Sequence, residues 1–283
     1  MYGAKVTFKG KKVNDIKWAE VRLGDGWFEQ SKLLNLEAVR DALADVVSQL
    51  KVKKTLDVVT CVYSPVAMTS VVNLPVRNSK ELFEYLELEA DKIVPLPLSI
   101  LNVDYYFVEK KKRSSKVLLA FAKKEIVYKY RDLALHVGLK LKSVSVRCVA
   151  LTNLALYSLN RGSIPQDKYI FLDTNGEVLS YSVIDEKSII NCRDIPVRGV
   201  ISLDDILEFM EKELEAYGLD FSDFVVVGTK RMLEELPEYV DRFRDLTGRD
   251  IKKVKLFEFV ENFDKTDPCI DVTVGLTLQE LRK

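Results

Sequence analysis

The 283-residue sequence contains one histidine and four cysteines, and neither residue type is placed for catalysis. His136 lies near the expected C-terminal end of a helix, where an imidazole is more often structural than catalytic. The cysteines form no C-x-x-C pair and are expected to be buried, reduced thiols: Cys61, Cys148, Cys192 and Cys269. We therefore predict no catalytic residue and no metal site.

The sequence also lacks net charge and long apolar runs. Its 43 basic and 43 acidic residues cancel, so composition favours neither nucleic acid nor an acidic partner. No apolar run approaches the ~18 residues of a membrane span, and residues 1–5 do not resemble the start of a signal peptide. With 47% hydrophobic and 30% charged residues, we expect a globular cytoplasmic protein that neither inserts directly into a membrane nor binds nucleic acid.

Residues 71–105 carry the most informative pattern in the chain. A β-branched strand ends at Pro75, and Asn78 with Glu81 three residues later predicts a capping box at a helix N-terminus. The helix has one apolar stripe, formed by Leu82, Leu86, Ala90 and Ile93. Its carboxylates fall on the other side and are read as a solvated face rather than a metal site. Pro95 should end the helix before a second strand, which gives a βαβ unit.

Two parts of the chain repeat the same order of elements. The first has strands at 3–9, 16–23 and 27–34, a helix over 36–50 and a buried strand at 56–62. The second has strands at 169–172, 178–184 and 189–192, a helix over 202–217 and a strand at 224–227, with turns at 173–176 and 185–188. Duplicated βββαβ halves are the signature of the actin, hexokinase and Hsp70 superfamily. The predicted fold class is therefore α/β and actin-like, with ribonuclease H-like halves.

An insertion interrupts the first half. It continues with a strand at 116–122, a helix from 123 that ends at Gly138, and a strand at 141–149. We predict a first actin-like subdomain at 1–70 plus 145–165, an inserted α/β subdomain at 71–144, and a second actin-like half at 166–283.

The order of Val71–Pro75, Glu84–Pro97 and Asp104–Tyr105 resembles the PilM family, the actin-like assembly proteins of type IV pili, and the related cytoplasmic part of GspL from type II secretion. Arg193–Gly199 is similar to an R-x-I-x-x-G element of that family, and Val274–Leu278 is similar to its final helix. The resemblance covers nearly the whole chain and is weakest in the first thirty residues. It implies a PilM- or FtsA-type inserted subdomain.

The nucleotide-binding device of actin-like ATPases is degenerate in this sequence. Those proteins hold Mg-ATP with two hairpins, each bearing an acid and a glycine. Thr7–Gly10 offers no carboxylate, Asn175 stands where Asp173-Thr174-Asn175-Gly176 should carry glycine, and only Gly228 remains of a Gly-Gly motif. Each lost charge-assisted contact weakens binding by about 1.5 to 3 kcal/mol. We predict a degenerate nucleotide cleft at Asp173, Asn175, Gly176 and Gly228, with no ATP hydrolysis and no cofactor.

Two runs of basic residues are most simply interpreted as solvated turns. The lysines around Gly10 could hold a phosphate, and Lys110–Arg113 could touch an anionic membrane or nucleic acid. Because Lys110–Arg113 lies between two strand-like segments, a hairpin loop is the preferred interpretation.

The resemblance implies a non-catalytic cytoplasmic scaffold, peripheral at the inner membrane, of a type IV pilus or type II secretion platform. The implied partner is the cytosolic N-terminal peptide of a PilN-like bitopic membrane protein, with the assembly ATPase as a further partner. The peptide would lie between the first domain and the insertion, and we predict contacts at Val72, Leu74, Leu86 and Tyr105.

Two alternatives are open from the residues. The first is a Mg-ATP-binding actin-like ATPase with an unusual first phosphate hairpin, in which Asp173 lies near the metal and Gly228 against the adenine. The second is a cell-division protein like FtsA, which is disfavoured because the sequence ends at Leu281-Arg282-Lys283 without an amphipathic membrane helix. Sequence does not choose between the pilus and the secretion machine.

Overall fold

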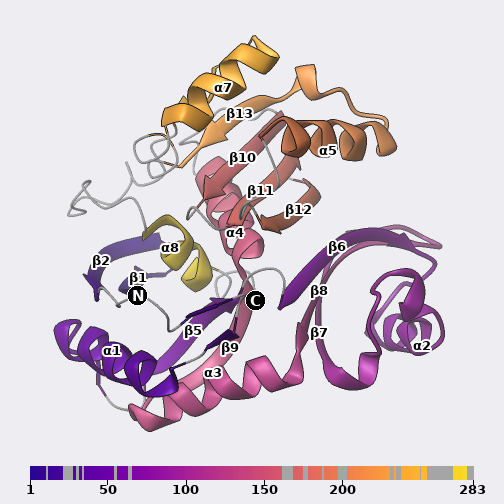
Figure 1. Ribbon diagram of the computed structural model, residues 1–283. Coiled ribbons are helices and arrows are strands. Elements are labelled where there is room, and N and C mark those ends of the chain that lie inside the picture. Colours follow the sequence, from indigo (N-terminus) through magenta and orange to yellow (C-terminus); the bar gives the residue numbers. More distant parts are fainter. Residues whose placement is uncertain are drawn as a thin grey trace.

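In the computed structural model, the sheets surround α4, a buried helix formed by Arg147–Asn160 (Figure 1). The first strands and α1 lie at the lower left of Figure 1, the inserted sheet at the right and the second half at the top. The structure describes residues 1–10, 12–21, 28–29, 32–33, 35–53, 56–62, 66–160, 168–174, 178–186, 188–196, 203–229, 233, 237–248, 250–253 and 270–278.

The first half begins with an antiparallel hairpin. Its strands are β1 (Tyr2–Lys9) and β2 (Lys12–Glu20), and Gly10 takes a left-handed φ of +62° at the turn. β2 begins earlier than the predicted residue 16 because pairing resumes directly after the turn. The predicted third strand at 27–34 is wrong: β3 (Phe28–Glu29) and β4 (Lys32–Leu33) pair with each other as a short antiparallel hairpin.

The rest of the first half follows the prediction more closely. Asn35 caps α1 (Leu36–Gln49) by accepting from the Ala38 backbone N–H at 3.1 Å. β5 (Asp57–Val62) then pairs in parallel with β9 (Lys140–Val146), which returns from the insertion.

The insertion is a three-stranded sheet covered by one helix. Its elements are β6 (Ala67–Leu74), α2 (Ser79–Glu89), the 3-10 turns η1 (Ala90–Lys92) and η2 (Leu98–Ile100), β7 (Leu101–Lys110) and β8 (Ser115–Lys123). The strand order is β6-β8-β7, and β8 is antiparallel to both neighbours. β6 and β7 are therefore parallel, joined through α2 as the predicted βαβ unit, with β8 inserted between them. Leu82 and Leu86 of α2 are buried against the sheet.

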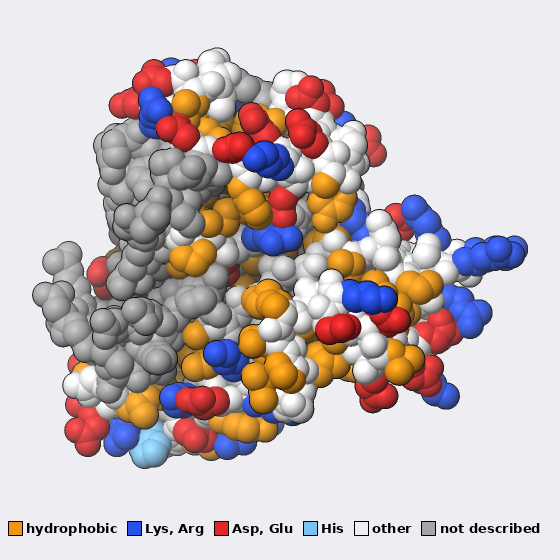
Figure 2. Space-filling model, turned by 45° about the vertical axis from the view of Figure 1, so that its right-hand side comes forward, with side chains coloured by type: hydrophobic (Ala, Val, Ile, Leu, Met, Phe, Trp, Pro, Cys, Tyr) orange, Lys and Arg blue, Asp and Glu red, His pale blue; other side chains and the backbone are white. Residues whose placement is uncertain are grey.

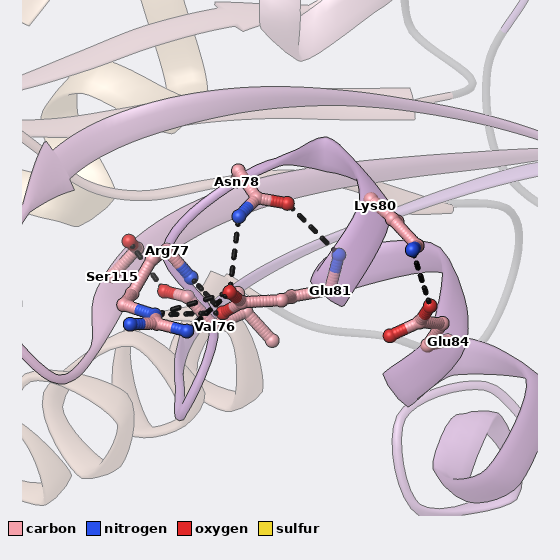
Figure 3. A network of polar contacts seen from close by, with 7 residues as sticks. All are labelled: Val76, Arg77, Asn78, Lys80, Glu81, Glu84 and Ser115. Atoms are coloured by element: carbon pink, nitrogen blue, oxygen red, sulfur yellow. Dashed lines mark hydrogen bonds and ion pairs between the residues drawn. The ribbon is translucent and has the colours of Figure 1, made fainter.

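The N-terminus of α2 is the predicted capping box with one change of partner (Figure 3). Asn78 Oδ1 accepts from the Glu81 backbone N–H at 3.0 Å. Glu81 reaches back to Asn78 Nδ2 at 3.0 Å and to the Arg77 backbone N–H at 2.9 Å, rather than to the backbone of the cap residue. Ser115 also donates to the Val76 carbonyl at 2.7 Å, which ties the helix entry to β8.

The helix ends show where the predicted boundaries need correction. α2 tightens into η1 after Glu89, so the predicted stripe ends in a 3-10 turn. α3 (Lys124–His136) ends as predicted: Gly138 has φ +74° and the Leu139 N–H donates to the Ala134 carbonyl at 2.9 Å, a Schellman motif.

The predicted strand at 141–149 is also wrong at its end. β9 stops at Val146 and α4 begins at Arg147. α4 is buried on nearly all sides, so its sequence carries no apolar stripe that would separate it from a strand.

The second half is a mixed five-stranded sheet of order β12-β11-β10-β13-β14. Its strands are β10 (Lys168–Thr174), β11 (Val178–Asp185), β12 (Ser188–Pro196), β13 (Val225–Gly228) and β14 (Lys252–Lys253). Its helices are α5 (Leu203–Ala216), the turn η3 (Phe221–Asp223) and α7 (Pro237–Thr247). Asp173 and Thr174 were predicted in a turn, but they are paired with Ser180 and Leu179 of β11. β12 extends beyond the predicted strand and takes in Arg193–Pro196.

The last helix, α8 (Ile270–Leu278), packs beside α4 (Figure 1). A Cβ atom at Gly275 would collide with the Ala150 carbonyl oxygen, so glycine is what lets the two helices approach closely. The core around α4 draws on both halves and on the insertion. The residue boundaries predicted for the three parts remain a prediction.

Candidate functional site

A pocket of about 220 Å³ lies between the inserted sheet and the first half. Strands β7 and β8, strand β9, helix α4 and the start of β12 form its walls. The lining side chains include Tyr106, Leu118, Ala120, Val144, Val149, Asn153 and Ile189. Hydrophobic side chains are visible across the middle of the face in Figure 2, and Lys and Arg side chains project at its right-hand tip. The pocket is therefore a mainly apolar groove where the insertion meets the first half, with Asp104, Ser145 and Thr152 among its polar lining.

The four predicted peptide contacts all pack on the α2 side of the inserted sheet. Leu74 and Leu86 are buried in the core beneath α2, with 5% and 1% exposure, and Val72 packs against the same core. Tyr105 borders the pocket, but its hydroxyl donates to Ser79 Oγ of α2 at 2.6 Å. Its ring also meets Phe83 and Phe107 edge to face, so its side chain belongs to the α2 face. Their role in binding remains a prediction.

The pocket is on the opposite face of the same strands. Side chains alternate along a strand, so Asp104 and Tyr106 lie on the pocket side while Tyr105 faces α2. Leu118 and Ala120 of β8 follow the same alternation. Both faces of β8 are apolar, and the sequence therefore carried no signal for which face meets the groove.

The predicted nucleotide residues are distributed as follows. Asp173 is 2% exposed; it forms an ion pair with Arg147, and its Oδ1 accepts from the Thr229 hydroxyl at 2.6 Å. Asn175 and Gly176 lie outside the described residues. At Gly228 a Cβ atom would lie 3.0 Å from Ile251 and 3.1 Å from Leu233, so the space at this glycine is tight, and its role in nucleotide binding remains a prediction.

Arg147 and Asp194 complete the buried polar cluster at Asp173. Burial raises the pKa of Asp194 to about 7, although the Ser180 hydroxyl donates to its Oδ1 at 2.7 Å and Arg147 lies nearby. Burial alone would lower the pKa of Arg147, but the charges of Asp173, Cys61 and Asp194, together with the hydrogen bond to Asp173, outweigh this and the pKa is raised. Arg147 is therefore a permanent cation in this cluster, and no sequence pattern had marked it.

Both oxygens of Asp173 are engaged within the protein, which bears on whether a hydrated metal fits there. In the part of the chain that the structure describes, no group of three or more His, Cys, Asp and Glu side chains is arranged to hold a metal ion. Asp173 therefore does not fit the role of a metal-binding carboxylate in this conformation.

Comparisons with solved structures establish the fold. The PilM-PilN type IV pilus biogenesis complex contains a chain that is 15% identical, with a TM-score of 0.77 and coverage of 98% of this chain and 94% of that one. A Bacteroides thetaiotaomicron protein of unknown function with an actin-like ATPase fold is 10% identical, with a TM-score of 0.54 and coverage of 98% and 95%. The fold is therefore actin-like.

A weaker likeness joins the cytoplasmic domain of EpsL, an inner-membrane component of the type II secretion system of Vibrio cholerae. It is 11% identical, with a TM-score of 0.40 and coverage of 65% of this chain and 60% of that one. No curated protein matches the chain. Among the described residues, none of the helices is both long and apolar enough to cross a bilayer.

The family model of the type IV pilus assembly protein PilM matches residues 7–221, which is well over half of the sequence. That match spans the insertion, the groove and the Arg147–Asp173 pair. The chain belongs to the family of the type IV pilus assembly protein PilM.

Proposed function

We propose that this chain is a non-catalytic scaffold on the cytoplasmic side of the inner-membrane platform of a type IV pilus. Its partner in this proposal is the cytosolic N-terminal segment of a PilN-like membrane protein, which holds the scaffold at the membrane. The observation that carries the proposal is the apolar groove between the inserted sheet and the first half. The assembly ATPase is a further proposed partner.

The chemistry of the groove supports an extended apolar segment as its occupant. Leu118, Ala120 and Val149 present apolar side chains, and a pocket of about 220 Å³ accommodates a few side chains rather than a folded domain. One of the solved structures with the same fold is a PilM-PilN complex, which supports the class of partner.

The state of Asp173 supports the non-catalytic part of the proposal. Its carboxylate is buried against Arg147 and Thr229, so a metal-bound triphosphate would have to displace an internal cation. In the first hairpin, Thr7–Gly10 offers Lys9 and Gly10 but no carboxylate. Weak nucleotide binding without hydrolysis is compatible with this arrangement.

Calorimetric titration tests the scaffold. The probe is a synthetic peptide with the cytosolic N-terminal residues of the PilN-like protein from the same organism, and we expect saturable binding at a single site. Ala120→Trp fills the groove and should abolish that binding. Leu88→Trp is the matched control, because Leu88 is 81% exposed on α2 and does not line the groove. Equal binding by both variants would show that the peptide binds at another surface.

Titration with Mg-ATP, followed by an assay for released phosphate, tests the non-catalytic part separately. We expect no phosphate release above that of a protein-free control. Saturable micromolar Mg-ATP binding that Asp173→Ala abolishes, together with hydrolysis, would establish the ATPase alternative instead.

A further inference from the structure

Asn153 is an unsatisfied hydrogen-bond donor in the wall of the groove. It lies on α4, is 3% exposed and lines the pocket, and its Nδ2, which is itself covered, has no hydrogen-bond partner among the residues that the structure describes. A buried amide group without a partner is costly, and natural proteins retain few of them. An occupant of the groove that displaces the side chains covering Nδ2 is therefore a candidate for the missing acceptor.

The neighbouring polar side chain on α4 differs from Asn153 in this respect. The Thr152 hydroxyl lies 2.8 Å from the Cys148 carbonyl and 2.8 Å from Ser182 Oγ, so its hydrogen bonds are made within the protein. Leu118, Ala120 and Val149 of β8 and α4 add apolar lining, while Asp104 and Ser145 on the neighbouring strands are polar. The donor of Asn153 is therefore flanked by apolar side chains of β8 and α4, where a hydrogen bond to it would discriminate strongly between ligands.

The strands that flank the pocket favour an extended occupant. Among the described strands, β7 is at one edge of the inserted sheet and β9 is at the edge of the β5-β9 pair. The backbone N–H of Tyr105 on β7 donates to the carboxylate of its own neighbour, Asp104, at 2.8 Å. A backbone donor that is satisfied by an adjacent side chain is available to an incoming strand if that side chain moves.

We propose that the groove recognises an extended apolar segment of its partner through a carbonyl oxygen that accepts a hydrogen bond from Asn153 Nδ2. The carbonyl belongs to the backbone or to a side-chain amide of that segment. This inference rests on the proposed function and adds a residue that sets specificity. A wholly apolar side chain at that point would leave the donor unsatisfied, and an ammonium group would oppose it.

Peptide titration of Asn153→Leu tests the inference. Leucine is similar in volume and removes both the donor and the acceptor of the amide. We expect binding of the PilN-like peptide to weaken about tenfold because the peptide carbonyl then loses its partner. The melting temperature should not fall, because the variant also removes an unsatisfied group from the folded protein. A purely structural role for Asn153 would instead lower the melting temperature and leave binding by the folded protein unchanged.

Ser158→Ala is the matched control. Ser158 lies on the same helix, is fully buried and also has an unsatisfied side-chain oxygen, but it does not line the pocket. This variant should bind the peptide as the wild type does. Asn153→Asp keeps the shape of the side chain and exchanges the donor for an acceptor, so it should bind at least as weakly as Asn153→Leu.

The outcomes separate the inference from the function on which it rests. If the wild type does not bind the peptide, the proposed function fails and the inference falls with it. If the wild type binds and Asn153→Leu binds equally well, the partner stands and the role of Asn153 is overturned. Tighter binding by Asn153→Asp than by the wild type would also overturn it, because the ligand would then supply the donor.

Discussion

Arg147, the first residue of α4, forms a buried ion pair with Asp173 near the end of β10. The pair joins the helix that continues from the groove strand β9 to the sheet of the second half. Val146, the residue before Arg147, lines the groove itself. Arg147, which neutralises Asp173, is therefore adjacent in the chain to the surface proposed for the partner.

Replacing Arg147 should be strongly destabilising. The side chains of Arg147 and Asp173 are 12% and 3% exposed, so Arg147→Met leaves a buried carboxylate without its counter-charge. We expect a loss of about 3 kcal/mol in the free energy of unfolding, measured by urea denaturation. The double variant Arg147→Met with Asp173→Asn should recover much of it. If the double variant is as unstable as the sum of the single variants, the two side chains are not coupled.

Stability should fall with rising pH because of Asp194. Burial raises its pKa to about 7, so the folded protein holds a proton that the unfolded chain releases near pH 4. This contribution is fully present below the unfolded pKa and is lost as the pH rises toward 7. The side chain of Asp194→Asn cannot ionise. The free energy of unfolding of this variant, relative to that of the wild type, should therefore rise by about 3 kcal/mol between pH 5 and pH 8. Urea denaturation at both pH values measures it, and a constant difference would contradict an ionising Asp194.

Adding a methyl group at Gly275 should separate α8 from α4. The Cβ atom of Gly275→Ala would overlap the Ala150 carbonyl, and backbone cannot move aside as a flexible side chain can. We expect Gly275→Ala to lower the free energy of unfolding by about 2 kcal/mol. Gly10→Ala is the control: nothing lies within 4 Å of its added Cβ, and only the strain of φ +62° acts, at about 1 kcal/mol. A smaller effect at Gly275 than at Gly10, measured by thermal unfolding, would contradict the close helix contact.

The N-terminal cap of α2 should contribute more to the stability of the folded protein than the ion pairs on the surface of this helix. Asn78→Ala removes the acceptor for the Glu81 backbone N–H and should cost about 1 kcal/mol. Lys80→Ala removes an exposed contact of 3.8 Å to Glu84 and should change the unfolding midpoint very little. Chemical denaturation of the two variants side by side measures this order, and the reverse order would show that the cap is not formed.

Local patterns identified the elements that have one clear period or one clear cap. The α2 stripe, the Asn78–Glu81 cap and the glycine stop at Gly138 were all readable, because each depends on residues within a few positions of each other. The duplicated order of strands also predicted an actin-like fold, which the comparisons confirm. Predictions failed where burial left no amphipathic period: α4 is buried on nearly all sides, and its first residues were therefore assigned to a strand.

The sequence by itself determined the family and the inserted βαβ unit, because these are properties of residue order, and the degenerate nucleotide motifs read from it remain a prediction. Only the tertiary structure decided which face of the inserted sheet meets the groove, since both faces are apolar and alternate residues point to opposite sides. It alone brought Arg147 to Asp173 and placed Asn153 in the pocket wall. These contacts join segments that are distant in the chain, and a one-dimensional pattern carries no record of packing between them.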